Sequence, residues 1–506
     1  NTTITAASGQ VAFDVYYGLG TTYYDGVSVT FDENFTGTVT GKVEYGASEK
    51  GSQQEGWLSK TQLDIQNGNF DITLSVHANY VDLPADQAEQ AAIEISGGKF
   101  EEKVDPAYLA EGLVFYEADG IMNVGERNSV VDGTNYVVSF NGEAYATIDA
   151  AVADGMVARI GTYGYASLAE ALAAAEAEDV VVLQTDTAIG TLILSDSFTL
   201  DLNGHTITSN ILFVNGDPDS VITANISNGA INATTYGILV YNNVELNVSN
   251  VDIYGGDTGI YVPVTVNDIT ATKSTAVNIE GGSVRGGSAG SVLCGIGDSD
   301  ATATSLVATD TLFAGGTFGI TGNGTAHNTY IELNNCTVVG GDATPEDGIT
   351  GDGVGIYHPQ AGELVVNGGS ITGVSSGIEV RAGTVTINDA DITATATEFS
   401  AVNNGNGTTI TGAAIAVSQH TTNLPIDVTV NGGTISGVQA VYEVDLENDE
   451  ATDLIVVTLN DGVYNGGVYS ENCTQFVSGG QYQDELDDSY FAPGFDMQLN
   501  DDGMYE

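Results

Sequence analysis

The sequence predicts an all-β protein that is mainly a parallel β-helix solenoid and begins with a smaller β-rich module. The first observation is a six-residue turn phrase that recurs from residue 202 to residue 482: an aliphatic residue, a polar residue, Gly, Asn or Asp, two variable residues and an apolar residue. Clear copies are Leu202-Asn-Gly-His-Thr-Ile207, Val366-Asn-Gly-Gly-Ser-Ile371 and Val430-Asn-Gly-Gly-Thr-Ile435. A short phrase repeated every ~20–45 residues indicates a solenoid, in which each repeat stacks on its neighbours.

The second observation is that eleven copies of the phrase agree column by column. The first residues are all Leu, Ile or Val: Leu202, Ile226, Val248, Ile279, Val307, Leu333, Val366, Ile387, Val430, Leu459 and Val477. The last residues are all apolar: Ile207, Ile231, Ile253, Val284, Leu312, Val338, Ile371, Ile392, Ile435, Tyr464 and Tyr482. The third residue is Gly, Asn or Asp in ten copies, with Thr309 as the exception. Those three residue types tolerate the left-handed backbone of a tight corner.

The third observation is the period of two in the strands around each phrase. For example, apolar and polar residues alternate along Ile426, Asp427, Val428, Thr429 and Val430. Strands of ordinary parallel sheets are buried on both faces, so their sequences are continuous apolar runs. A parallel β-helix has one face inside and one face in water, so it accounts for the alternation. The alternative is an antiparallel sandwich with frequent turns.

A stacked row of Asn side chains is also expected, because six copies carry Asn directly after the first residue. Stacked amides can hydrogen-bond from coil to coil along the solenoid axis. These residues are Asn203, Asn334, Asn367, Asn388, Asn431 and Asn460.

The smaller module, residues 1–125, carries two further turn phrases, Ile65-Gln-Asn-Gly-Asn-Phe70 and Ile95-Ser-Gly-Gly-Lys-Phe100. Residues 97–120 resemble residues 479–503 at an offset of 382, until a one-residue slip near the end. We interpret this as one module-closing segment used twice. The first copy continues through Val124, so we expect the second copy to continue past Glu506.

A helix is predicted where the solenoid begins. Ser167 and Glu170 form a capping box, and Leu168, Ala171 and Leu172 lie on one apolar stripe. A fainter copy of this segment lies 20 residues earlier, at 145–152. The predicted parts are therefore the module (1–125), a connector (126–164), a capping helix (165–179), the parallel β-helix (180–482) and a closing segment (483–506).

Composition limits the classes of partner. The 506 residues include 68 acidic and 10 basic residues, a net charge of −58, which disfavours nucleic acid and anionic membranes. No stretch of about 18 apolar residues is present to span a membrane. Three cysteines, Cys294, Cys336 and Cys473, without a CxxC pattern, are expected to be buried free thiols. Together with the scarcity of Lys and Arg, which means few trypsin sites, these features suit an extracellular or cell-surface protein.

Tyr165-Ala-Ser-Leu-Ala-Glu-Ala171, followed by Leu200-Asp-Leu-Asn-Gly-His-Thr-Ile207, resembles the entry to a right-handed β-helix of the pectate-lyase-like superfold. The most similar version occurs in surface proteins of gut Gram-positive bacteria and in some phage proteins. The resemblance covers about residues 145–506 and implies the fold, a right-handed coil and a capping helix. It does not select a function, because the superfold carries lyases, hydrolases, adhesins and tail spikes.

The residues show no catalytic constellation. Lyases of this superfold pair Arg or Lys with a Ca²⁺-binding acid cluster, but after residue 160 the basic residues are only Lys273, Arg285 and Arg381, none beside an acidic trio. A hydrolase needs a carboxylate pair, and with 68 acidic residues some pair meets that distance by chance.

Two long coils, from 334 to 367 and from 388 to 431, carry the candidate ligand-binding residues. One short coil separates them, so their loops should emerge roughly 10 Å apart and form a lip over one face. The acids of the first loop also have the oxygen ligands that calcium prefers. The residues of the lip are Asp342, Glu346, Asp347, Asp352, His358, Asn403, Asn404, Asn406 and His420.

We expect an extracellular, non-catalytic stalk or adhesin that binds a glycan, a host surface protein or neighbouring copies of itself through side loops. A polysaccharide lyase or glycoside hydrolase is the alternative, and a trimeric phage tail spike is the third hypothesis. Calcium is the one cofactor considered.

Overall fold

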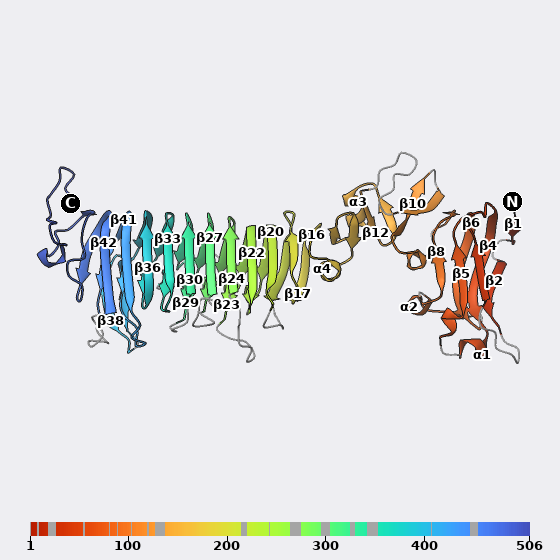
Figure 1. The fold of residues 1–506 in the computed structure, drawn as a ribbon, viewed down its shortest axis with the longest axis horizontal. Helices are drawn as coiled ribbons and strands as arrows, with labels where there is room; N and C mark the ends of the chain where they lie inside the picture. The colour runs from red at the N-terminus through yellow and green to blue at the C-terminus, as the bar shows by residue number, and fades with distance from the viewer. Residues whose placement is uncertain are drawn as a thin grey trace. The chain divides into compact units, whose positions relative to one another are not determined.

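The computed structural model describes residues 2–7, 10–18, 27–53, 56–79, 81–88, 90–102, 104–118, 121–126, 137–213, 220–241, 243–263, 275–294, 304–323, 329–341, 353–405, 407–445 and 454–506. The chain forms two compact units, Asn1–Ala174 and Ala175–Glu506. Figure 1 shows the strands β16 to β42 of the second unit stacked one after another.

The second unit is a β-solenoid with three parallel sheets, one for each side of a coil. The first sheet contains β16 (Val180–Leu183), β18 (Phe198–Asp201), β20 (Ile222–Ala233), β22 (Val244–Gly255), β24 (Thr275–Glu280), β27 (Thr304–Thr309), β30 (Thr329–Asn334), β33 (Glu363–Asn367), β36 (Gly383–Asn388), β41 (Ile426–Glu443) and β42 (Ile455–Ser470). The long strands β20, β22, β41 and β42 bend round a corner and continue into the next sheet.

The other two sheets follow the same stacking. The second contains β17 (Thr187–Leu194), β19 (Thr206–Phe213), β25 (Ser283–Gly286), β28 (Leu312–Gly315), β31 (Thr337–Gly340), β34 (Ser370–Gly373), β37 (Ala390–Ala394) and β43 (Gln481–Tyr482), with parts of the long strands. The third contains the end of β19, then β21 (Tyr236–Val240), β23 (Thr258–Val262), β26 (Ala289–Leu293), β29 (Phe318–Gly322), β32 (Val354–His358), β35 (Ser376–Val380), β40 (Ala413–Val417) and the ends of β41 and β42. The parallel pairing rules out the antiparallel sandwich for this unit.

The strand register confirms most of the predicted columns and corrects two coils. Nine of the eleven predicted first residues form one continuous column, from Ile226 to Val477, with Ala308 in place of Val307. In that same coil Phe313, rather than Leu312, pairs with Val284 and Val338. The predicted phrase there was wrong by one residue, because Val307 is more apolar than the small Ala308 that fills the interior.

In the first coil Leu200, not Leu202, pairs with Ile226, so this corner is two residues longer than predicted. The shift at Ala308 also removes the Thr309 exception. The third residue of the corrected phrase is Asp310, which has a left-handed φ of 50°, as Asn335 and Asp389 have at the equivalent corners. A left-handed φ is costly for most residues and tolerated by Asn, Asp and Gly, which explains the column.

Stacked asparagines form two ladders along the first sheet. In the predicted ladder each amide Nδ2 donates to the Oδ1 of the previous coil at 2.8–2.9 Å, through Asn334, Asn367, Asn388, Asn431 and Asn460. Asn203 is not part of it and donates instead to the carbonyl of Leu183. A second ladder, one residue before the apolar column, links Asn225, Asn247 and Asn278.

The three cysteines of the second unit are buried and unpaired with one another, as the sequence predicts. Burial raises the pKa of the Cys294 thiol to about 11, so this thiol stays protonated near neutral pH. Among the described residues, no helix is long and apolar enough to cross a membrane.

The first unit begins with a second, shorter set of stacked parallel strands. One sheet contains β1 (Thr3–Thr5), β2 (Val11–Tyr17), β4 (Thr38–Ala47), β6 (Asn69–Ala78) and β9 (Lys99–Phe100), and the other contains β3 (Val27–Phe31), β5 (Thr61–Ile65) and β8 (Ile93–Ile95). The two predicted phrases stack in register, Ile65 on Ile95 and Phe70 on Phe100. Short helices α1 (Glu49–Ser52) and α2 (Ala85–Ala88) lie between strands, and β7 (Val81–Asp82) pairs antiparallel with β6.

The repeated closing segment adopts the same structure at both of its positions. Leu109 bridges to Ile95 in the first copy, and Phe491 bridges to Val477 in the second, both at an offset of 382. Met122 then pairs antiparallel with Phe100, whereas Tyr505 pairs antiparallel with Tyr482. The offset has become 383, so the one-residue slip predicted from the sequence is confirmed.

After the hairpin β10 (Leu113–Ala118) and β11 (Ile121–Glu126), the first unit ends with two hairpin–helix repeats. The first is β12 (Val138–Phe140), β13 (Glu143–Tyr145) and α3 (Ile148–Ala153), and the second is β14 (Ala158–Ile160), β15 (Tyr163–Tyr165) and α4 (Leu168–Ala174). The second helix starts as predicted, with the Oγ of Ser167 accepting from the Glu170 amide at 3.2 Å. Leu168 and Ala171 are its buried residues.

Candidate functional site

The predicted lip is divided between two corners of the solenoid: its positions 342–352 and 403–406 lie between the second and third sheets, whereas its His358 and His420 lie where the third sheet ends and the chain turns to the first sheet. Its acidic residues Asp342, Glu346, Asp347 and Asp352, together with Asn406, lie outside the described residues. The first insertion, at 342–352, leaves between β31 and β32, and the second leaves between β37 and β40, two coils further along. Both insertions therefore start from the same corner of the solenoid, the one between the second and third sheets.

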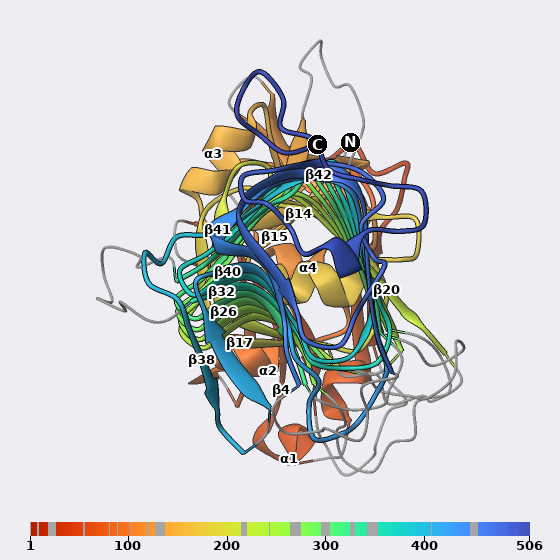
Figure 2. The ribbon, with the colours of Figure 1, turned by 90° about the vertical axis from the view of Figure 1, so that its left-hand side faces the viewer.

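The second insertion folds back as a hairpin, β38 (Ser400–Asn403) and β39 (Thr408–Thr411). Figure 2, a view along the solenoid, shows β38 on the outer side of the sheet that holds β26, β32 and β40. Beneath the hairpin is a small hydrophobic cluster in which Ile410, Ala413, Ala416 and Val444 are buried. The Phe399 ring packs against Tyr442, with centroids 4.6 Å apart. The insertion is therefore a packed element with its own core.

The predicted residues Asn403 and Asn404 form the tip of this hairpin. The Asn403 Oδ1 accepts from the Gly405 amide at 2.8 Å, and the Asn404 amide donates to the Gly407 carbonyl at 3.0 Å. Asn403 is exposed, so its position leaves part of the tip open to a ligand.

His358 and His420, the two histidines of the predicted lip, lie on coils that flank Arg381. The Arg381 amide donates to the His358 carbonyl at 2.9 Å, and the His420 amide donates to the Arg381 carbonyl at 3.2 Å. His358 is fully buried, and burial lowers its pKa to about 4. His420 is only partly buried, and burial together with the Arg381 charge lowers its pKa. The structure thus brings the two histidines close along the axis but presents only His420 at the surface.

Below the hairpin lies a buried ion pair that the sequence did not predict. The Arg381 guanidinium donates to the Glu379 carboxylate at 2.5 Å, and the two side chains are 5% and 8% exposed. Burial raises the pKa of Glu379, and the Arg381 charge opposes that shift. Arg381 extends toward the hairpin turn, where a Cβ on Gly407 would lie 2.4 Å from its Nη1. The pair therefore lies directly beneath the end of the hairpin.

The outer face of the third sheet carries a row of tyrosines along the axis. Tyr261, Tyr357, Tyr442 and Tyr469 occupy the same outward column, with Val292, Thr321, Glu379 and Ala416 between them. Tyr442 and Tyr469 stack with centroids 5.0 Å apart, and Tyr469 is 42% exposed. A partly exposed aromatic row beside polar groups is a surface on which a sugar can pack.

A surface hollow of about 610 Å³ lies on the first sheet, beside the segment that leads from β40 into β41. Tyr330, Glu363, Thr384 and Asp427 stand in one register row across four neighbouring strands. Leu424 and Pro425 form one wall. The Tyr330 hydroxyl donates to Glu332 at 2.6 Å, and this bond raises the pKa of Tyr330 to about 12.

Sequence reasoning identified the two long coils but missed the tyrosine row and the hollow. The tyrosines are far apart in the sequence, at 261, 357, 442 and 469, so only the coil register aligns them. Comparison of the chain with protein-family models, with curated proteins and with solved structures finds no match.

Proposed function

We propose that this protein is an extracellular β-helical surface protein that acts as a stalk or adhesin and binds glycan through the outer face of its third sheet, without catalysis. The observation that carries the proposal is the tyrosine column Tyr261, Tyr357, Tyr442 and Tyr469 beside the packed β38–β39 hairpin. Side chains and loops that are held in place by a rigid scaffold commonly form binding surfaces.

Three further features belong to this proposal. The solenoid turns in the right-handed sense, and α4 caps its first coil, since an open solenoid end exposes strand edges and an apolar interior. The net charge of −58 keeps the surface soluble and repels self-association. Strongly acidic glycans are disfavoured by the same charge, so the ligand class is a neutral oligosaccharide.

The experiment is binding of neutral oligosaccharides to the full chain, screened on an array and measured by calorimetry. Tyr442→Ala and Tyr469→Ala should each weaken binding about tenfold, which corresponds to ~1.4 kcal/mol, in line with the loss of one aromatic stacking contact. Tyr254→Ala is the matched control, because Tyr254 points outward from the second sheet beside Arg285. Equal losses in Tyr254→Ala and Tyr442→Ala would contradict the proposal.

A second candidate function, glycoside hydrolysis, is favoured by one specific observation. Glu363 and Asp427 line the same hollow and lie two strands apart in one register row, which places their backbones ~9.6 Å apart. Inverting glycosidases hold their carboxyl groups ~6.5–9.5 Å apart. Release of reducing ends that is lost in both Glu363→Gln and Asp427→Asn would establish the hydrolase and overturn the non-catalytic proposal.

A further inference from the structure

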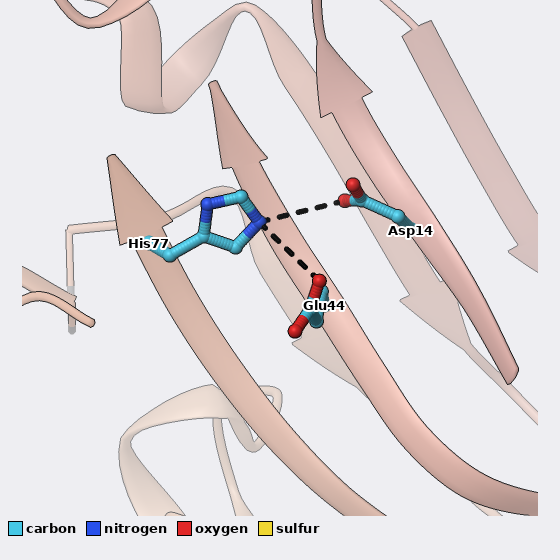
Figure 3. A group of neighbouring side chains, drawn as sticks. All are labelled: Asp14, Glu44 and His77. Atoms are coloured by element: carbon cyan, nitrogen blue, oxygen red, sulfur yellow. Dashed lines mark ion pairs between the residues drawn. The ribbon is translucent and has the colours of Figure 1, made fainter. Parts of the chain in front are cut away.

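Three side chains with metal-ligating atoms converge on the outer face of the first unit. Asp14 on β2, Glu44 on β4 and His77 on β6 come from three adjacent parallel strands. Asp14 is in register with Glu44, and His77 lies two residues further along, on the same face. Figure 3 shows the His77 ring reaching over β4 toward both carboxylates.

The distances suit a shared ion better than direct pairing. The His77 Nε2 lies 3.8 Å from the Asp14 Oδ1 and 3.7 Å from the Glu44 Oε2, and the three ligand atoms all lie within 4.8 Å of one another. Hydrogen bonds would need about 2.7–3.2 Å. Ligands bound tetrahedrally at ~2.0–2.1 Å lie ~3.3 Å apart. The two distances from the His77 Nε2 therefore need to close by about half an ångström, and the distance between the two carboxylates by at most about 1.5 Å.

A glycine makes this arrangement possible. Gly46 lies beside His77 in the strand register, between it and Tyr16. A Cβ at Gly46 would stand 2.2–2.6 Å from three atoms of the His77 ring. The imidazole thus occupies the space that a side chain at position 46 would fill. The Tyr16 ring stacks on the imidazole, with centroids 6.1 Å apart. The backbone and its neighbours hold the imidazole across the strand with its Nε2 toward the acids.

Burial and charge also favour a bound cation. His77 is 2% exposed, Glu44 is 14% exposed and Asp14 is 27% exposed, so the ion would be reached from the Asp14 side. The group places two carboxyl side chains beside one imidazole, so its charge favours a cation. Lys42 donates to the other Glu44 oxygen at 2.7 Å and neutralises part of the negative charge.

We propose that Asp14, Glu44 and His77 bind one divalent transition-metal ion of the zinc class and thereby tie strands β2, β4 and β6 together. The imidazole sets the class, since Zn²⁺ accepts nitrogen together with carboxylate oxygen, whereas Ca²⁺ takes oxygen ligands. Three protein ligands leave a fourth position for water on the exposed side.

The experiment is a calorimetric titration of the full chain with Zn²⁺ in the presence of excess Mg²⁺, which occupies the many exposed carboxylates without needing an imidazole. We expect one saturable site per chain. His77→Gln and Asp14→Asn should each weaken it at least tenfold, and Asp14→Asn is the variant least disturbing to the fold because Asp14 is the most exposed ligand. His205→Gln is the matched control: His205 lies 3.4 Å from one carboxylate, Asp186, and is 32% exposed.

The variant Gly46→Ala tests whether Zn²⁺ binding depends on the position of the imidazole or only on the nearby negative charge. It keeps all three ligands but places a methyl group where the imidazole lies, so Zn²⁺ affinity should fall at least tenfold while the circular dichroism spectrum is retained. A Co²⁺ absorption spectrum reports whether nitrogen coordination is lost in the same variant. The proposal is overturned if no saturable Zn²⁺ site remains above the Mg²⁺ background, or if His77→Gln and Gly46→Ala bind Zn²⁺ as the unaltered chain does.

Discussion

The Arg381 guanidinium donates to the Glu379 carboxylate at 2.5 Å beneath the β38–β39 hairpin, and both side chains are almost fully buried. Both residues belong to the outward-facing side of the third sheet, which elsewhere meets solvent. The hairpin covers them with the cluster around Ile410 and Ala416. The pair is therefore shielded from solvent on a face of the sheet that is otherwise partly exposed.

Removing one partner of this pair should be strongly destabilising. Arg381→Met leaves the Glu379 carboxylate buried without its counter-charge, and such a loss costs about 3–5 kcal/mol. The double variant Glu379→Leu/Arg381→Met, which removes both charges, should recover most of that loss. Urea denaturation followed by circular dichroism measures both values.

Asp186→Asn is the matched control for this prediction. Its partner His205 lies at 3.4 Å, and the two side chains are 74% and 32% exposed. An exposed pair contributes at most about 1 kcal/mol. A loss in Arg381→Met no greater than that in Asp186→Asn would show that Glu379 does not need its partner.

The asparagine ladder should contribute to stability coil by coil. Asn388 donates to Asn367 and accepts from Asn431, so Asn388→Ala removes two hydrogen bonds worth about 1–3 kcal/mol together. Asn465→Ala removes one bond, to the Ser436 hydroxyl at 3.1 Å, and should cost about half as much. Denaturation midpoints of the two variants measure the difference, and equal midpoints would argue against cooperative stacking.

Much of the solenoid could be predicted because its determinants are local in the sequence. A left-handed corner needs Asn, Asp or Gly, and the interior column needs an apolar residue at a fixed distance from it. The one-residue error at Val307 shows the limit of that reasoning. Ala308 fills the column although Val307 is the more apolar residue, and only the left-handed φ of Asp310 identifies the correct register.

The candidate sites could be predicted only in part, because they depend on which coil lies beside which. Coil lengths identified the two long coils, but neither the corner at which each insertion leaves nor the packing of Phe399 on Tyr442 beneath the hairpin of the second one. The zinc-class site combines Asp14, Glu44 and His77, residues from three separate strands. The only signal near these residues in the sequence is Gly46, a glycine inside a strand that does not need a positive φ. Its role becomes clear only when the strand register places it beside His77.

Stability should fall in mildly acidic solution because of His358. Its pKa is about 4 in the folded protein, lowered by burial from an ordinary value of 6.5. In the unfolded chain His358 therefore binds a proton below about pH 6.5, whereas in the folded chain it binds one only below about pH 4. The stability present above pH 6.5 is lost progressively between pH 6.5 and pH 4, by up to about 3 kcal/mol for a shift of this size.

Carboxylates titrate near the lower end of that range, so the decisive measurement is the difference between variants. His358→Gln removes the titrating group and should flatten the free energy of unfolding between pH 6.5 and pH 4 relative to the unaltered chain. His420→Gln should flatten it less, because His420 is only partly buried although burial and the Arg381 charge lower its pKa in the same direction. Urea denaturation at a series of pH values gives both profiles. If the His358→Gln profile ran parallel to that of the unaltered chain, His358 would have to take up its proton in the folded chain at the same pH as in the unfolded chain, and the prediction would be wrong.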